Sequence, residues 1–188
     1  MKKVFIIHGW GGNPKEPWFV WIKKELEKRN FKVIIPKMPN PNYPKINVWV
    51  SKLKKQIKNP DENTYLIGHS IGCQTILRYL QVLNKKIGGC IFVAGWFDLK
   101  NLEKEEKPIA KPWIKNKINF NKIKTTTKNF IAILSDNDPY GALNLNKKIF
   151  KNKLGAKVII EHNKGHLSPD YNIARLPSAL KAILNISK

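Results

Sequence analysis

One stretch of the sequence limits the folds open to this chain more than any other. Residues 64–67 form a short apolar run, Gly-His-Ser-Ile-Gly follows at residues 68–72, and apolar residues then recur at helical spacing through residues 73–80. This order predicts a buried strand, a sharp turn and a helix. Glycines two positions before and after Ser70 leave room for neighbouring segments to pass close to the turn. The serine hydroxyl is expected to project into open space.

Strand and helix patterns alternate along the rest of the chain. Apolar runs predict strands at residues 4–7, 31–35, 64–67, 87–94, 130–134 and 157–161. Amphipathic patterns predict helices at residues 18–29, 46–57 and 142–150, and helices that start at 71 and 177. Such alternation is typical of an α/β domain with a mostly parallel sheet, here of about six strands, and helices on both faces. We expect one domain over residues 1–188.

Two segments lack a regular period. Residues 36–44 contain four prolines, which predicts a stiff loop because proline disrupts both helices and strand ladders. Residues 95–129 begin with a charge-rich stretch and continue with scattered prolines. Two interpretations of this second segment stay open. It is either a small cap or lid over the sheet or a plain solvated connection.

The charge is unusual for a globular domain. The chain has 35 Lys plus Arg against 13 Asp plus Glu, a net charge of +22. Such an excess attracts nucleic acid, anionic membranes or acidic partners. Only three of the cations are arginine, at positions 29, 78 and 175, and the lysines are spread along the whole chain. Specific phosphate readers usually rely on arginine, so we favour a lysine-rich solvated surface over a dedicated nucleic-acid site.

Cysteine usage and the N-terminus indicate a compartment. Cys73 and Cys90 both fall in apolar patterns, so we expect two buried thiols rather than a disulfide framework or a zinc site. The apolar run at residues 4–7 is too short for a signal peptide, and no segment approaches the ~18 apolar residues of a membrane span. We therefore expect a soluble, cytoplasmic protein.

A serine hydroxyl attacks a carbonyl only with help from a base that an acid orients. The chain has four histidines. His8 and His69 lie within the strand-end motifs, and His69 is expected to point away from the nucleophile's face. His166 follows a glycine just beyond the last predicted strand, where its ring can reach over Ser70. We therefore favour His166 over His162, which lies nearer the strand end.

The orienting acid is expected after the fifth predicted strand. Asp136 and Asp138 both follow that strand, and either can serve as a turn-forming aspartate. Asp138 precedes Pro139, whose fixed φ would hold the carboxylate's direction, so we favour Asp138. Ser, Asp, His is also the chain order that strand–turn–helix serine hydrolases use.

Two backbone amides are candidates for stabilising an oxyanion. The amide of Ile71 lies at the start of the helix after Ser70, where N–H groups and the helix dipole favour negative charge. The amide of Trp10 lies in the glycine-rich segment 8–12 after the first strand, where a backbone N–H can approach a substrate closely. That segment lacks a phosphate-binding pattern, which argues against a nucleotide site.

These motifs together resemble a known family. The carrying residues are His8-Gly9-Trp10-Gly11-Gly12, Met38-Pro39-Asn40-Pro41 with Trp49, Gly68-His69-Ser70-Ile71-Gly72, Asp136-Asn137-Asp138-Pro139-Tyr140 and Gly165-His166. The chain resembles the α/β-hydrolase superfamily, and within it the small serine hydrolases grouped with retinoblastoma-binding protein nine and its bacterial relatives. The resemblance implies a compact sheet, the triad Ser70, Asp138 and His166, and hydrolysis without a metal or cofactor. Leu167 departs from the usual Gly-His-Phe-like ending, and the surface is more basic than expected.

Two hypotheses from different classes follow. The first is a serine hydrolase that cleaves a small carboxylic ester, or an amide, through an acyl-enzyme on Ser70. The second is a non-catalytic protein of the same fold whose basic surface binds nucleic acid or an acidic protein. The second depends on the net charge of +22 alone. The sequence does not predict the oligomeric state.

Overall fold

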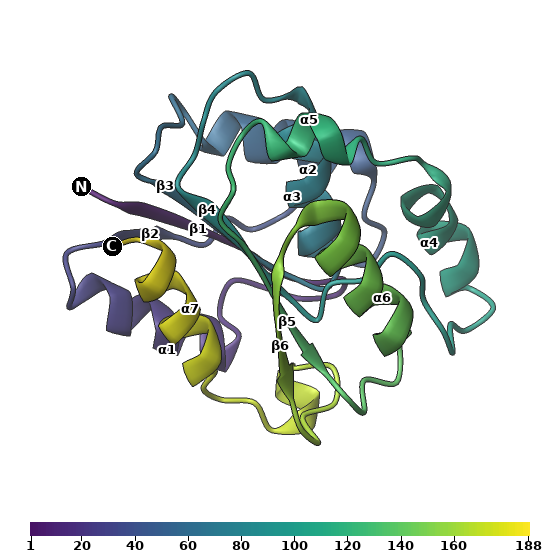
Figure 1. Ribbon diagram of the computed structural model, residues 1–188. Helices are drawn as coiled ribbons and strands as arrows, with labels where there is room; N and C mark the ends of the chain where they lie inside the picture. The colour runs from purple at the N-terminus through teal and green to yellow at the C-terminus, as the bar shows by residue number, and fades with distance from the viewer.

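The chain folds around one sheet of six parallel strands. The computed structural model describes residues 1–188, and the strands lie in the order β2-β1-β3-β4-β5-β6 (Figure 1). Every neighbouring pair is parallel. The strands are β1 (Lys3–Ile7), β2 (Lys32–Ile34), β3 (Thr64–His69), β4 (Gly89–Val93), β5 (Phe130–Ser135) and β6 (Lys157–Glu161). The predicted α/β class with a mostly parallel sheet is confirmed.

Helices cover both faces of the sheet. They are α1 (Pro17–Glu27), α2 (Ile46–Gln56), α3 (Ile71–Val82), α4 (Glu106–Lys115), α5 (Phe120–Lys124), α6 (Leu143–Ile149), the π-helix Phe150–Leu154, the 3₁₀ turn Pro169–Tyr171 and α7 (Pro177–Ile186). Helices α1 and α7 pack on one face of the sheet, and α2, α3, α5 and the π-helix pack on the other (Figure 1).

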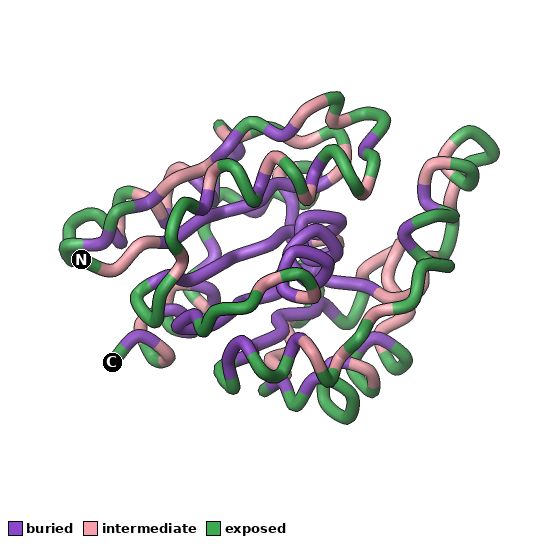
Figure 2. Tube along the Cα trace, turned by 90° about the horizontal axis from the view of Figure 1, so that it is seen from above, coloured by how far each residue is buried: buried purple, intermediate pink, exposed green.

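The apolar strand runs place the core on both sides of the sheet. One buried cluster joins α2 and α3 to the sheet and the other joins α1 and α7 to it. Figure 2 shows the buried residues concentrated in the strands and in a central helix. That helix is α3, in which every residue from Ile71 to Leu80 is buried. Because α3 is packed along nearly its whole length, the position of its N-terminus is fixed.

The chain changes direction across the sheet between β1 and β3. From β1 it moves outward to β2, then returns to form β3 on the other side of β1 and continues through β4, β5 and β6. β1 and β3 pair in parallel, with Ile7 opposite Gly68. In open parallel sheets ligands bind beyond the carboxyl ends of the strands at such a reversal. The loop after β1 and the turn after β3 meet there.

Residues 95–129 contain two short helices, α4 and α5, which the sequence pattern did not predict. Their connection is tied to the body of the protein by Arg78 of α3. Its guanidinium donates to the carbonyl oxygens of Trp113 at 2.6 Å and Asn116 at 3.2 Å. Trp113 is itself buried, and its indole donates to the Pro44 carbonyl oxygen at 3.0 Å. The second half of the segment is thus anchored to α3 and to the proline-rich loop.

Two further predictions concern the cysteines and the helix at residues 142–150. Cys73 and Cys90 are both free and buried, as predicted, and burial raises the pKa of each thiol. The helix predicted at residues 142–150 is longer than expected, because the π-helix extends it to Leu154. No helix is both long enough and apolar enough to cross a membrane.

Candidate active site

Ser70 occupies a strained turn between β3 and α3. Its φ is 52° and its ψ is −120°, a conformation that L-residues with a side chain rarely adopt. The Ser70 amide donates to the Val93 carbonyl oxygen of β4 at 2.9 Å, which helps to hold the turn in place. A Cβ added to Gly72 would collide with the Ile7 carbonyl oxygen, and one on Gly68 would lie 2.7 Å from the Cys73 nitrogen. Both glycines are therefore required by close packing, as the sequence predicted.

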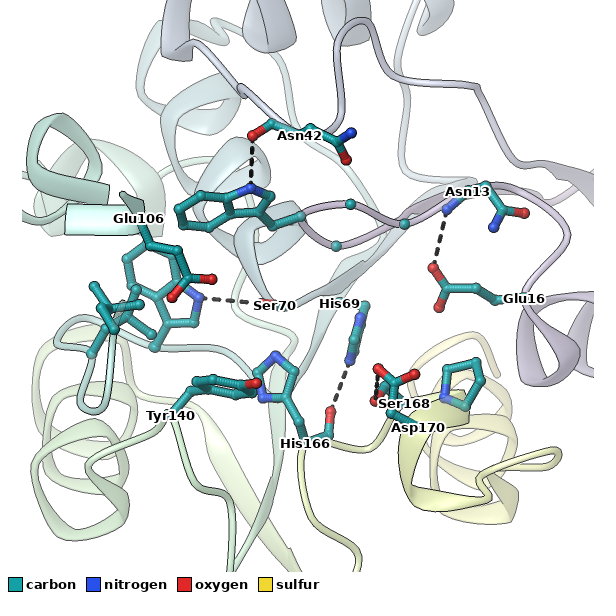
Figure 3. A pocket seen from close by; sticks show the side chains of 18 residues that line it. Asn13, Glu16, Asn42, His69, Ser70, Glu106, Tyr140, His166, Ser168 and Asp170 are labelled. Carbon is teal, nitrogen blue, oxygen red and sulfur yellow. Dashed lines mark hydrogen bonds between the residues drawn. The ribbon is translucent and has the colours of Figure 1, made fainter. Parts of the chain in front are cut away.

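A cavity of about 640 Å³ opens at this edge of the sheet. Ser70 lines it together with Trp10 from the loop after β1 and His166 from the loop after β6. In Figure 3 the His166 ring points toward Ser70. The volume lies within the range of small-molecule sites. Segments far apart in the sequence thus contribute to one site.

Asp138 and His166 form a hydrogen-bonded pair. The Nδ1 of His166 lies 2.8 Å from Oδ2 of Asp138 and 3.0 Å from Oδ1. Oδ1 also accepts from the amides of Tyr140 at 3.0 Å and Gly141 at 3.2 Å, so the carboxylate is held by its own turn. Because Nδ1 donates to the carboxylate, Nε2 of a neutral His166 presents a lone pair. Only 12% of the histidine side chain and 8% of the aspartate side chain are exposed.

Asp136 and His162 form a second pair on the neighbouring surface. The Nδ1 of His162 lies 2.6 Å from Oδ2 of Asp136, whose Oδ1 accepts from the Asn163 amide at 2.9 Å. These two contacts lower the pKa of the Asp136 carboxyl. The His162 side chain is 77% exposed, and neither residue lines the cavity. The structure therefore brings His166, bonded to Asp138, to the cavity with Ser70, and leaves Asp136 and His162 outside it.

The predicted orientation of His69 is wrong. Its ring lines the same cavity as Ser70, and its Nε2 donates to the His166 carbonyl oxygen at 2.9 Å (Figure 3). Burial, with a smaller contribution from His166, lowers the pKa of His69 to about 3, so the ring is neutral. Gly9 makes room for it, because a Cβ there would lie 2.9 Å from His69 Nδ1. His69 thus ties the backbone at His166 to the nucleophile turn.

Trp96, which the sequence analysis did not identify, contacts the nucleophile. Its indole Nε1 donates to Ser70 Oγ at 3.4 Å, and its side chain is almost fully buried in the cavity wall. Its carbonyl oxygen accepts from the Gln74 side chain of α3. The signal was its position, since Trp96 follows the carboxyl end of β4, where ligand-contacting residues of a parallel sheet gather.

The glycine-rich loop after β1 is attached to the proline-rich loop. The Gly11 amide donates to the Pro41 carbonyl oxygen at 2.9 Å, and the Trp10 indole donates to the Asn42 carbonyl oxygen at 2.9 Å. The Met38 amide donates to Nε2 of buried His8 at 3.0 Å. The proline-rich loop therefore acts as a stiff support for the segment that carries the Trp10 amide.

A buried carboxylate also belongs to the cavity wall and was missed from the sequence. Glu16 is 8% exposed, and its Oε1 accepts from the Asn13 amide at 3.2 Å. Its Oε2 is buried and has no hydrogen-bond partner. Burial raises the pKa of Glu16 to about 7, and the nearby charge of Asp170 adds to the increase. Glu16 precedes α1 by one residue, a position that resembles an ordinary helix start in the sequence.

Comparison with known proteins shows which family the sequence matches. The sequence profile of a family described as serine hydrolase matches residues 4–185. The chain belongs to the serine hydrolase family. It is 31% identical over 179 residues to YdeN of Bacillus subtilis (strain 168), a match that covers 94% of this chain and 91% of YdeN. It is 25% identical over 169 residues to the serine hydrolase RBBP9 of Rattus norvegicus, covering 87% of this chain and 86% of the rat protein.

A solved structure of a relative has the same fold. The crystal structure of the ydeN gene product from B. subtilis matches this chain with a TM-score of 0.90 and 28% identity. The match covers 99% of this chain and 98% of that one. The predicted resemblance to the α/β-hydrolase serine hydrolases is therefore confirmed at the level of family and fold.

Proposed function

We propose that this serine hydrolase cleaves a small carboxylic ester, or an amide, through an acyl-enzyme on Ser70. The observation that carries the proposal is the bonded Asp138–His166 pair, whose histidine lines one cavity with a serine on a strained turn. Serine, histidine and aspartate in this relation are the parts that nucleophilic acyl transfer requires.

Each residue has a separate role in the proposed reaction. Ser70 Oγ attacks the substrate carbonyl carbon while Nε2 of His166 takes the hydroxyl proton. The imidazolium then gives that proton to the leaving alcohol or amine, and the ester bond to Ser70 forms as the substrate's bond breaks. Asp138 holds the ring orientation and stabilises the charged imidazolium. Water, activated by the same histidine, then releases the acid and restores Ser70.

The amides of Ile71 and Trp10 are the proposed donors to the tetrahedral oxyanion. Ile71 is the first residue of α3, and the first amides of a helix have no partner within it. Trp10 lies on the opposite side of the crevice between β1 and β3, next to Gly11, whose own amide is already bonded to Pro41. Two preorganised donors of this kind stabilise charge where it develops in the transition state.

Trp96 is proposed as a positioning residue. Its indole N–H contacts Ser70 Oγ, and this contact restricts the rotamers of a hydroxyl that must present a lone pair to the substrate. The interaction also leaves the hydroxyl proton free to move toward His166. In structures without substrate, the bond between nucleophile and base is commonly loose and tightens when substrate binds.

A fluorophosphonate probe tests the proposed nucleophile. The wild-type protein should gain the mass of one phosphonyl group, located on the peptide that contains Ser70, and should hydrolyse p-nitrophenyl butyrate. Ser70→Ala should show neither property. Thr75→Ser is a matched control, because Thr75 is a buried hydroxyl of α3 that bonds the Ile71 carbonyl oxygen and does not line the cavity. Equal labelling of wild type and Ser70→Ala would remove the assignment.

We propose a cytoplasmic location for the protein. Two buried free thiols suit a reducing cytoplasm. The net charge of +22 is the only support for a nucleic-acid partner, so we propose no second function for it.

A further inference from the structure

The cavity has a charge opposite to that of the rest of the chain. None of the 35 lysines and arginines lines it. Three of the 13 acidic residues do, namely Glu16, Glu106 and Asp170. On a chain this rich in lysine, no cationic side chain stands among these acidic residues in the cavity lining. Acidic residues in a cavity lining do not by themselves identify a binding site, so the burial and hydrogen bonds of each residue decide.

Of these three residues, Glu16 has a buried oxygen that lacks a hydrogen-bond partner. More than nine-tenths of the residue is buried, and its Oε2 has neither a hydrogen-bond partner nor a salt bridge. A buried carboxylate oxygen without a partner carries a desolvation cost, because its lost hydration is not replaced by a hydrogen bond. Figure 3 shows the Glu16 side chain extending into the cavity, close to Asp170. A group that brings a positive charge and N–H donors would remove that cost.

A glycine of the loop after β1 packs against this carboxyl group. Gly12 lies against Glu16, and a Cβ at Gly12 would collide with Oε1. The loop therefore places no side chain over the carboxylate on that side. Asp170 is exposed at the cavity rim, and Ser168 Oγ donates to its Oδ2 at 3.5 Å. One buried and one exposed carboxylate thus share a wall of the cavity that contains Ser70.

We propose that Glu16 and Asp170 form a subsite for a positively charged nitrogen, a primary ammonium group, on the substrate of this hydrolase. The inference depends on the proposed hydrolysis at Ser70 and specifies its substrate class, an ester or amide that carries an amine. The ammonium pairs with the Glu16 carboxyl group, whose Oε2 has no other partner, and Asp170 attracts it from the rim. Glu106 lies on the other side of Ser70 (Figure 3) and is not part of this subsite.

Matched pairs of esters test the proposal, each pair differing by an ammonium group in place of a methyl group. Ethyl alaninate with ethyl isobutyrate, and p-nitrophenyl 6-aminohexanoate with p-nitrophenyl heptanoate, place the charge on the acyl side at short and long reach. The pair 5-aminopentyl butyrate and hexyl butyrate places it on the alcohol side. The readout is the ratio of kcat/KM within each pair, compared between wild type and variants, because the intrinsic reactivity of the esters cancels in that comparison.

The wild-type protein should prefer the ammonium member of at least one pair by about tenfold, as expected for a site built around a charged hydrogen bond. Glu16→Gln keeps the acceptor for the Asn13 amide and removes the charge, and should reduce that preference about tenfold. Asp170→Asn should reduce it about threefold, since its charge is more exposed. Glu62→Gln, a carboxylate that lies outside this cavity, should keep both rates at wild-type values.

Two results would overturn the subsite: equal kcat/KM within all three pairs, or a preference that neither variant changes. Thermal melting monitored by circular dichroism checks that Glu16→Gln is folded. If it is not, Asp170→Asn decides alone, because an exposed side chain can be changed without affecting the core. Failure of the proposed function is distinguishable, since it would abolish turnover of the neutral esters and probe labelling at Ser70 as well.

Discussion

Two aspartate–histidine pairs lie side by side where β5 and β6 end, and each has a hydrogen bond between histidine Nδ1 and aspartate Oδ2. Asp136–His162 has the shorter bond, 2.6 Å against 2.8 Å for Asp138–His166. The first pair has an exposed histidine and the second has both side chains almost buried. Only the second pair has a histidine that lines the cavity with Ser70. A short Asp–His contact is therefore insufficient to identify a catalytic pair, whereas burial beside a nucleophile is informative.

Replacing each histidine gives the largest expected contrast. His166→Ala should lower kcat/KM for p-nitrophenyl butyrate by more than about 10³-fold, because the proton of Ser70 then has no acceptor. His162→Ala should stay within about twofold of wild type, since its ring is in solvent. Steady-state kinetics on both purified variants measures the difference. Comparable losses in the two variants would show that the pairs have been assigned the wrong way round.

Replacing each aspartate gives a smaller contrast of the same kind. Asp138→Asn should lower kcat by about 10²- to 10⁴-fold, because an amide can stabilise the wrong tautomer of His166 and cannot stabilise an imidazolium. Asp136→Asn should leave kcat near the wild-type value. Neither change alters side-chain volume much, so both variants can be compared at equal folded concentration. A large effect of Asp136→Asn would contradict the account.

The backbone of His166 is bonded by His69, a buried histidine with a neutral ring. The burial of His69 predicts an effect of pH on stability. Burial lowers the pKa of His69 to about 3 in the folded protein, below the ordinary value of about 6.5 for an unfolded histidine. The unfolded state therefore binds more protons in acid, and the free energy of unfolding falls as the pH drops from about 6.5 toward 3. His69→Gln, which keeps an N–H donor, should have a flatter dependence over that range.

Urea unfolding of wild type and His69→Gln at several pH values between 7 and 4 measures that dependence. The other acidic and basic groups titrate alike in both proteins, so the difference between the two curves isolates His69. The difference should approach a few kcal/mol at the acid end, given about 1.4 kcal/mol for each tenfold change in proton affinity. Parallel curves would show that His69 is not buried neutral beside His166.

The smallest predicted effect concerns the contact between Trp96 and Ser70, which lies near the buried pair and not near the exposed one. Trp96→Phe removes the N–H that contacts Ser70 Oγ and should lower kcat about 2- to 10-fold, with little change in KM. Trp113→Phe is the matched control, since that indole donates to the Pro44 carbonyl oxygen outside the cavity. It should affect stability and leave kcat unchanged. An unaltered kcat in Trp96→Phe would remove its positioning role.

The sequence predicted the order of strands and helices along the chain. Parallel strands that are buried on both faces appear in a sequence as continuous apolar runs. The strand at residues 157–161 was predicted at its observed bounds, and others differ by one or two residues at their ends. Residues 95–129 were not predicted, because α4 contains Pro112 and α5 has only one fully buried residue, Ile123. Their helices depend on tertiary anchors such as Arg78, which no local pattern reveals.

The candidate site was predictable only where backbone chemistry dictates residue type. The glycines around Ser70 are needed for close packing, and their spacing is visible in the sequence. The orientation of His69 was predicted wrongly because it depends on the loop of His166, 97 residues away. Glu16 gave no local signal, and the only signal for Trp96 was its position after β4, since the roles of both arise from what the fold places beside them. Sequence patterns specify turns well and contacts across a crevice poorly.

A double substitution tests the central claim that Ser70 and His166 act as one unit. The measurement is kcat/KM for p-nitrophenyl butyrate in Ser70→Ala, His166→Ala and the combined variant. Residues that act together are strongly non-additive, so the combined variant should be no slower than Ser70→Ala alone. Losses that multiply, so that removing His166 slows a protein that already lacks Ser70, would show that the two side chains act independently and would contradict the account.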